Sequence, residues 1–163
     1  MSFWRHLAAV LLLPGVVAVA VPAALLWSDG ASLSVLAVIG IPLLAAGVLL
    51  IVSTIRLFAS AGRGTLAPWD ATRRLVVAGP YRYVRNPMIS GVLLTLLGEA
   101  ACFGSVSLVV WFGAVFALNA VYIPLVEEPG LEARFGEDYR RYKANVPRWL
   151  PRLRAWAPEE TTS

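Results

Sequence analysis

Long apolar runs separated by short polar stretches dominate the pattern of this chain. A helix needs about 20 consecutive apolar residues to cross a bilayer. Runs of about that length cover residues 7–27, 33–57, 88–103 and 106–126, and the third is the shortest and contains Glu99. The pattern therefore predicts four transmembrane helices, the last two joined by a tight hairpin.

A different pattern follows the last apolar run. Between Leu131 and Val146, apolar side chains recur every three or four residues, and charged side chains fill the positions between them. This spacing predicts one amphipathic helix over about residues 130–146 that lies in the membrane interface. Residues 159–163 are expected to fray. We therefore expect residues 1–158 to form a single all-α integral membrane domain, with four transmembrane helices, a cytoplasmic loop and this C-terminal interfacial helix.

The composition agrees with a membrane protein, because 58% of the residues are hydrophobic and only 15% are charged. One cysteine and one histidine supply neither an intrachain disulfide nor a His/Cys zinc site, so no metal is expected. An alternative interpretation of the first apolar run is a cleaved signal peptide, which its flanking residues resemble. We favour a retained helix, because three more spans follow and the run continues past the candidate cleavage site.

The positive charges all flank one set of helix ends. Of the 14 lysines and arginines, one precedes the first span, six lie in or beside the loop between the second and third spans, and seven lie in the tail. The opposite side carries only Asp29. The positive-inside rule then places both termini and the central loop in the cytoplasm of a multi-pass protein of the cell (inner) membrane. This placement indicates membrane lipids as partners and argues against nucleic acid.

The segment Gly79–Gly91, with the sequence GPYRYVRNPMISG, lies between apolar runs yet is rich in polar and charged side chains. Gly79–Pro80 and Asn86–Pro87 each join a capping residue to a proline that suits the first turn of a helix. We predict a helical turn over Pro80–Arg85 and then a helix capped by Asn86. The free N–H groups of that helix, with the neighbouring arginine, suit an anionic group such as a carboxylate. A basic loop that only sets topology is an equal alternative.

The same membrane face is expected to carry the pair Glu127–Glu128. S-adenosylmethionine has a sulfonium cation, a carboxylate and an adenine, so it would match these groups. Arg85 and the helix start could take the carboxylate, Tyr81 or Tyr83 could stack on the base, and either glutamate could offset a positive charge or orient the nucleophile. Methyl transfer needs alignment and exclusion of water more than acid–base groups.

The first motif reads Gly79-Pro80-Tyr81-x-x-x-Arg85-Asn86-Pro87 and resembles the G-P-Y-x-x-x-R-H/N-P motif of the isoprenylcysteine carboxyl methyltransferase family. These are integral membrane methyltransferases related to the phospholipid N-methyltransferases. A second block, E-E-x-x-L-x-x-x-F-G-x-x-Y-x-x-Y-x-x-x-V-P, runs from Glu127 to Pro147 and is similar to that family's C-terminal signature. The two blocks stand in the expected order, and the resemblance covers about residues 56–151.

The resemblance implies that S-adenosylmethionine binds in a cytoplasmic pocket roofed by the loop and the tail, and that a lipophilic acceptor enters from the bilayer and is methylated on oxygen, sulfur or nitrogen. Carried over by position, the transfer site would contain Arg85, Glu128 and Glu127. The cofactor would contact Gly79, Tyr81, Arg85, Asn86, Pro87 and Tyr139, although the last is also explained as the buried face of the tail helix. Asn86 and Ile89 replace a histidine and a tyrosine of the family, which argues against a prenylcysteine acceptor.

Two other functions remain open. The first is a four-span, proton-coupled transporter of small molecules that uses Glu99, because a carboxylate within a membrane is a functional candidate. The simpler explanation for Glu99 is that it forms a hydrogen bond near the far membrane interface. The second is an NADPH-dependent enzyme of the sterol-reductase type, which has a similar C-terminal fold. The second span contains small residues that suit close helix packing within the chain or between chains, namely Gly40, Ala45, Ala46 and Gly47. The sequence therefore leaves the oligomeric state open. It also leaves the identity of the methyl acceptor open.

Overall fold

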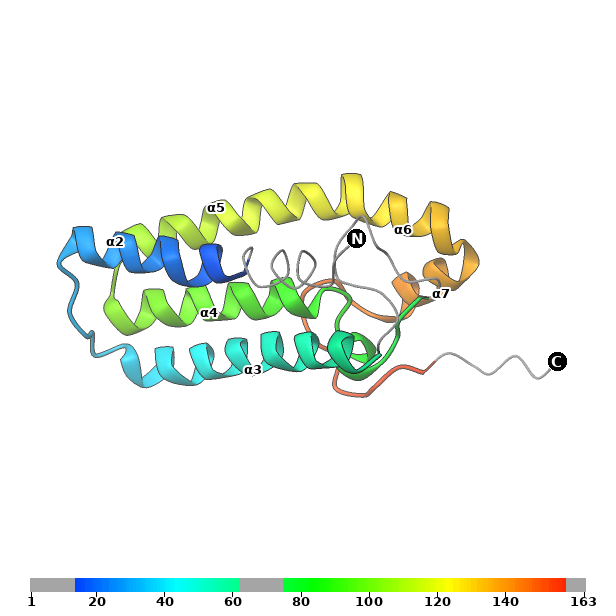
Figure 1. Ribbon diagram of the computed structural model, residues 1–163, viewed down its shortest axis with the longest axis horizontal. Helices are drawn as coiled ribbons and strands as arrows, with labels where there is room; N and C mark the ends of the chain where they lie inside the picture. The colour runs from blue at the N-terminus through cyan, green and yellow to red at the C-terminus, as the bar shows by residue number, and fades with distance from the viewer. Residues whose placement is uncertain (1–13, 62–74, 158–163) are drawn as a thin grey trace.

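Long helices run back and forth along one axis of the computed structural model, which describes residues 14–61 and 75–157 (Figure 1). The described chain is all-helical, without strands, as the sequence predicts. The elements are η1 (Val16–Ala20), α2 (Val21–Asp29), α3 (Ala37–Ala61), η2 (Gly79–Arg82), α4 (Pro87–Phe103), α5 (Val106–Tyr122), η3 (Ile123–Glu127), α6 (Glu128–Phe135) and α7 (Glu137–Asn145). The start of the first predicted span, residues 62–74 of the central loop and the tail that was predicted to fray lie outside the described residues.

Two stretches are long and apolar enough to cross a membrane, namely Ala37–Leu57 in α3 and Val106–Phe135, which joins α5, η3 and α6. Val16–Asp29 and Pro87–Phe103 are apolar but shorter. Large apolar side chains such as Val38 and Leu118 point outward from these helices. The membrane class is thereby supported, and the four-span topology stays a prediction.

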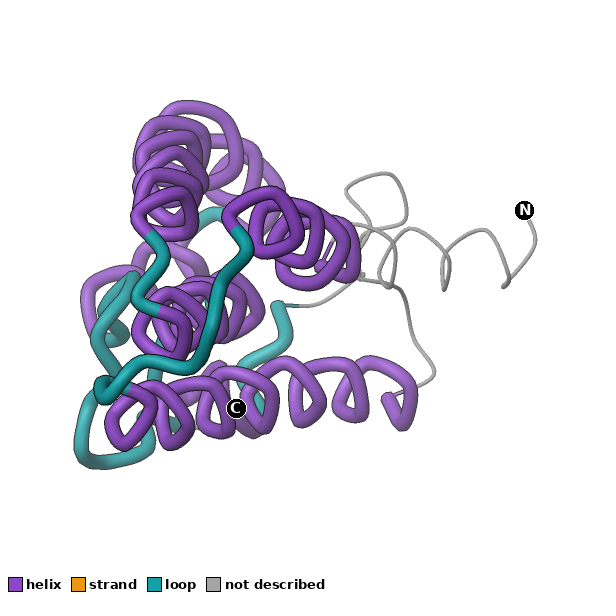
Figure 2. Tube along the Cα trace, turned by 90° about the vertical axis from the view of Figure 1, so that its left-hand side faces the viewer, coloured by secondary structure: helices purple, strands orange, loops and turns teal. Residues whose placement is uncertain are grey.

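Helices α3 and α4 approach each other at glycines. A Cβ atom added to Gly98 would lie 2.5 Å from the Leu44 nitrogen, and one added to Gly47 would lie 2.6 Å from the Gly91 oxygen. Only glycine lets two backbones come this close. Figure 2 shows α3 crossing obliquely beneath α4, while α2, α4 and α5 are seen nearly end-on. The small residues Gly40 and Gly47 of the second span therefore serve packing within the chain.

The hairpin between α4 and α5 forms as predicted. Gly104 has φ +59°, a conformation that favours glycine, and ends α4. The side chain of Ser105 then caps α5 by accepting a hydrogen bond from the Leu108 nitrogen at 3.2 Å. At the same end, the Ser34 nitrogen donates to the Cys102 carbonyl at 2.8 Å, and α3 starts at Ala37, four residues later than the second predicted span.

The tail differs from the single helix predicted over residues 130–146. The helix that begins as α5 continues without a break through η3 and α6 to Phe135. It ends at Gly136, whose φ of +55° favours glycine, and α7 then leads in a new direction (Figure 1). Gly136 thus places α7 beside the start of α4 instead of extending α6 away from it.

Candidate functional site

The two sequence motifs meet at one end of the helix bundle, at the right of Figure 1. There α4 begins, η2 precedes it, and the long helix passes from η3 into α6 before turning into α7. The Arg85 Nη1 atom donates to Glu128 Oε1 at 3.0 Å, across 43 positions of sequence. The structure therefore joins the arginine of the first motif to the glutamate of the second.

The first motif is more compact than predicted. Its turn is a 3-10 helix over Gly79–Arg82, shorter than the predicted turn over Pro80–Arg85. Gly79 is not its cap, because Ala78 holds that position and Gly79 itself has φ +51°. Asn86 does occupy the cap position of α4, but its side chain makes no capping hydrogen bond. Its carbonyl accepts a hydrogen bond from the Ser90 nitrogen at 2.9 Å.

Glu128 is the centre of a buried ionic cluster and is only 2% exposed. Besides Arg85, it contacts Arg148 Nε through Oε1 at 2.7 Å and Lys143 Nζ through Oε2 at 3.1 Å. Three cations around one carboxylate keep it ionised and offset the cost of its burial. The cluster also ties together the loop before α4, the start of α6, α7 and the segment after it.

Two buried polar atoms at the start of α4 have no partner among the described residues. The Arg85 side chain is 10% exposed, and its Nε is buried without a hydrogen bond. The buried Ser90 Oγ is likewise unpaired. Unsatisfied buried donors are uncommon and call for an explanation such as a ligand or an ion. Pro87, at the first position of α4, is buried beside them.

Glu127 behaves differently from its neighbour. It is half-buried, and no hydrogen bond or ion pair is recorded for its carboxylate within the described part of the chain. The charge of Glu127 contributes to the raised pKa of Tyr81, after burial and the Tyr142 phenol, so Glu127 and Tyr81 lie in one electrostatic environment. Glu127 is therefore available to a ligand, whereas Glu128 is not.

Two tyrosines of α7 are buried next to the first motif. Tyr139 and Tyr142 are buried with Val146, and the Tyr142 hydroxyl donates to the Tyr81 carbonyl at 2.8 Å. Burial, and after it the charge of Glu128, raises the pKa of Tyr139 to about 12. Burial also raises the pKa of Tyr142, so both phenols are neutral near neutral pH. Tyr139 thus adjoins the ionic cluster and is also part of the buried face of α7.

Residues 146–157, here called the C-terminal segment, run alongside the first motif. The Arg85 nitrogen donates to the Pro147 carbonyl at 2.9 Å and the Arg152 nitrogen to the Tyr83 carbonyl at 3.0 Å. Arg82 adds a hydrogen bond near the end of the segment, since its Nε donates to the Trp156 carbonyl at 2.8 Å. These bonds hold the segment against residues 82–85, where Val84 is buried and Tyr83 remains 40% exposed.

Sequence reasoning named no site residue after Pro147 and missed two of the three cations. Lys143 and Arg148 entered the argument only as charges that set topology, although Arg148 directly follows the Val-Pro end of the second block. The position of Arg148 next to this block was the sequence feature that could have identified it as a site residue. Trp149, in the same C-terminal segment, packs against Phe116 with ring centroids 5.7 Å apart.

Glu99 lies apart from the site. It is near the far end of α4, whereas Arg85 precedes the start of that helix. One of its oxygens, Oε2, is buried and has no partner among the described residues, so no hydrogen bond to this oxygen supports the simpler explanation. Within the same residues, no group of three or more His, Cys, Asp or Glu side chains could hold a metal ion.

Comparisons with known proteins agree with the geometry. The family model described as "Phospholipid methyltransferase" matches residues 35–138. A protein of Haemophilus influenzae described as uncharacterized is 38% identical over 66 residues, which are 100% of that protein and 39% of this chain. No solved structure matches. The range matched by the family contains Arg85, Glu127 and Glu128, while Lys143 and Arg148 lie beyond it.

Proposed function

The chain belongs to the phospholipid methyltransferase family, and from that premise we propose that it transfers a methyl group from S-adenosylmethionine to a small lipophilic acceptor at the cytoplasmic face of a membrane. The observation that carries the proposal is the buried contact of Arg85 with Glu128, because it assembles the two motifs into one site. The family match favours neither the transporter nor the reductase alternative.

The site contains groups that suit both the negative and the positive charge of the cofactor. The unpaired donors Arg85 Nε and Ser90 Oγ, with the first N–H groups of α4, suit a carboxylate. Glu127, which has no recorded partner in the described chain, suits a positive charge. S-adenosylmethionine, when bound, supplies a methyl group activated by its sulfonium. We assign Gly79, Tyr81, Asn86, Pro87 and Tyr139 to the surrounding wall on the same proposal.

The two adjacent glutamates have separate roles in this proposal. Glu128 is buried and paired with three cations, so it positions Arg85 and the C-terminal segment. Glu127 is free to accept a hydrogen bond, and then the proton, from the O–H, S–H or N–H group of the acceptor. The C-terminal segment lies over buried Val84 and over Arg85, whose side chain is 10% exposed. Exclusion of water from this arginine favours transfer to the acceptor over hydrolysis.

The membrane placement belongs to the same proposal. With four spans and both termini in the cytoplasm, the site lies at the cytoplasmic surface, where positive charge gathers. Apolar side chains cover the outward faces of α3 and α5, so a lipophilic acceptor reaches the site from the bilayer.

Binding of S-adenosylhomocysteine to the detergent-solubilised protein tests the proposal by calorimetric titration. We expect saturable binding to the wild type and a loss of about tenfold or more in Arg85→Ala, the effect of removing a charged hydrogen bond of about 1.5–3 kcal/mol. Arg154→Ala removes the same charge from an exposed position and should bind like the wild type. A folded wild type that binds no S-adenosylhomocysteine, or equal binding by both variants, contradicts the assignment.

A further inference from the structure

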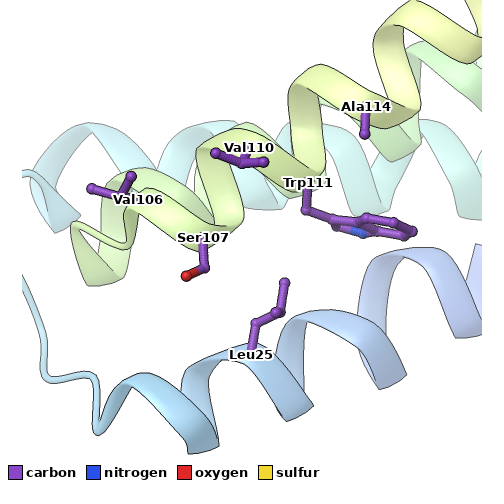
Figure 3. A pocket seen from close by; sticks show the side chains of 6 residues that line it. All are labelled: Leu25, Val106, Ser107, Val110, Trp111 and Ala114. Carbon is purple, nitrogen blue, oxygen red and sulfur yellow. The ribbon is translucent and has the colours of Figure 1, made fainter.

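An apolar groove lies between α2 and α5, at the opposite end of the bundle from the Arg85–Glu128 site. It has a volume of about 370 Å³. Figure 3 shows its lining, which is Leu25 from α2 and Val106, Ser107, Val110, Trp111 and Ala114 from α5. Glu128 lies 22 positions after the first of these α5 residues, which corresponds to about 30 Å along a helix. The groove is therefore separate from the proposed transfer site.

One charged group stands at the rim of the groove. Ser107, which lines it, donates to Asp29 Oδ1 at 3.2 Å, and Ser105 donates to Asp29 Oδ2 at 2.8 Å. A carboxylate has about four acceptor positions, so Asp29 keeps capacity for further donors. Among the described residues at this end, 24–36 and 103–110, Asp29 is the only charged side chain. The rim thus favours a cation.

Trp111 is held in place within the groove. Its indole Nε1 donates to the Val17 carbonyl at 3.0 Å. In the π-helical pattern of η1, each carbonyl pairs with the N–H group five residues later, so the Val17 carbonyl would pair with residue 22. Residue 22 is a proline without an N–H group, so the Val17 carbonyl is free to accept from the indole. The bond fixes the indole between α2 and α5, so the groove has a rigid wall.

We propose that the groove binds one acyl chain of a lipid from the non-cytoplasmic leaflet and that the primary ammonium of its headgroup pairs with Asp29. From Ser107 to Ala114 the groove extends about 10 Å along the helix, within the roughly 15 Å of one leaflet's hydrocarbon. Trp27, 91% exposed beside Asp29, marks the interface level. The lipid is a structural ligand and not the methyl acceptor, and its binding depends on the membrane placement but not on the reaction.

Photocrosslinking in lipid nanodiscs tests this site. The probes are phosphatidylethanolamine and phosphatidylglycerol that carry the same diazirine-labelled acyl chain, and mass spectrometry locates the crosslinks. We expect the ethanolamine lipid to label residues 106–114 or 21–29, and the glycerol lipid to label them about two- to fivefold less, the effect of one exposed ion pair. Asp29→Asn should remove this preference, and Ala114→Phe should block labelling by both.

Ala117→Phe adds the same bulk to α5 outside the groove and should label like the wild type. Thermal melting and S-adenosylhomocysteine titration of each variant show separately whether it is folded and whether its distal site is intact. Equal labelling by both lipids that Asp29→Asn leaves unchanged would overturn the proposal, as would a wild type in which neither lipid labels residues 106–114 or 21–29.

Discussion

At the scale of single residues, Glu127 and Glu128 show how neighbours in sequence acquire different tasks. Adjacent residues of a helix point about 100° apart, so only one of the two can face the cations of α7 and the loop. Glu128 does so and is buried, while Glu127 remains unpaired within the described chain. The pair therefore combines an anchor with a group that is free to act on a ligand.

Glu128→Gln should lower stability far more than Glu127→Gln. The change leaves Arg85 nearly buried without its counterion, and breaking a buried ion pair costs about 3–5 kcal/mol. Thermal melting in detergent should show a clear decrease for Glu128→Gln and little change for Glu127→Gln. Glu127→Gln should still bind S-adenosylhomocysteine but lose methyl transfer to an accepted substrate. Equal melting of the two variants would contradict the separate roles.

At the scale of elements, two π-helical turns shape the bundle, and each ends just before a proline. In η1 the Val21 nitrogen bonds to the Val16 carbonyl and Pro22 follows, while in η3 the Glu128 nitrogen bonds to the Ile123 carbonyl and Pro129 follows. A π turn adds a residue to the helix and rotates what comes after it. The turn in η3 therefore sets the direction in which Glu128 points.

The contact between α3 and α4 predicts a contrast between two glycines. In Gly98→Ala, the new methyl group meets the backbone of Leu44, which cannot move aside, so we expect destabilisation of about 1–3 kcal/mol. Gly113, within α5, has open space around it, so Gly113→Ala should be neutral or stabilise the helix by up to about 1 kcal/mol. Thermal melting of the two variants checks this, and a Gly98→Ala protein as stable as the wild type would argue against the close approach.

At the scale of the whole molecule, charge divides the bundle into two ends. Arg82, Arg85, α7 and the C-terminal segment lie at one end, and Asp29 lies at the other (Figure 1). The C-terminal segment completes the first end by bonding back to the motif. This asymmetry supports a cytoplasmic site and a non-cytoplasmic Asp29.

Cysteine labelling in intact cells tests that orientation. Ser28→Cys should react with a membrane-impermeant maleimide added outside, whereas Leu153→Cys, at a fully exposed position, should react only after the membrane is permeabilised. The native Cys102 is buried and should stay unreactive in both backgrounds. Outside labelling of Leu153→Cys alone would mean the opposite orientation, and outside labelling of both would mean an even number of crossings between the two positions, not three.

Features that depend on neighbouring residues could be predicted from the sequence. Long apolar runs indicated the helices α2 to α5, and Gly104–Ser105 indicated their last hairpin. The two motifs, with the positive charges gathered near them, predicted that Arg85 and Glu127–Glu128 would share one site. The helices and the hairpin are confirmed, because helix formation and turn geometry respond to short stretches of the chain. The membrane crossings and the shared catalytic site stay predictions.

Only the tertiary structure decided which groups of that site touch. It selected Glu128 over Glu127 as the partner of Arg85 and recruited Arg148 and Lys143 to the same carboxylate. It also placed Trp156 against Arg82, across 74 positions of sequence. No local pattern encodes such contacts, because they depend on where Gly136 turns the chain and on how the packed helices bring distant segments together.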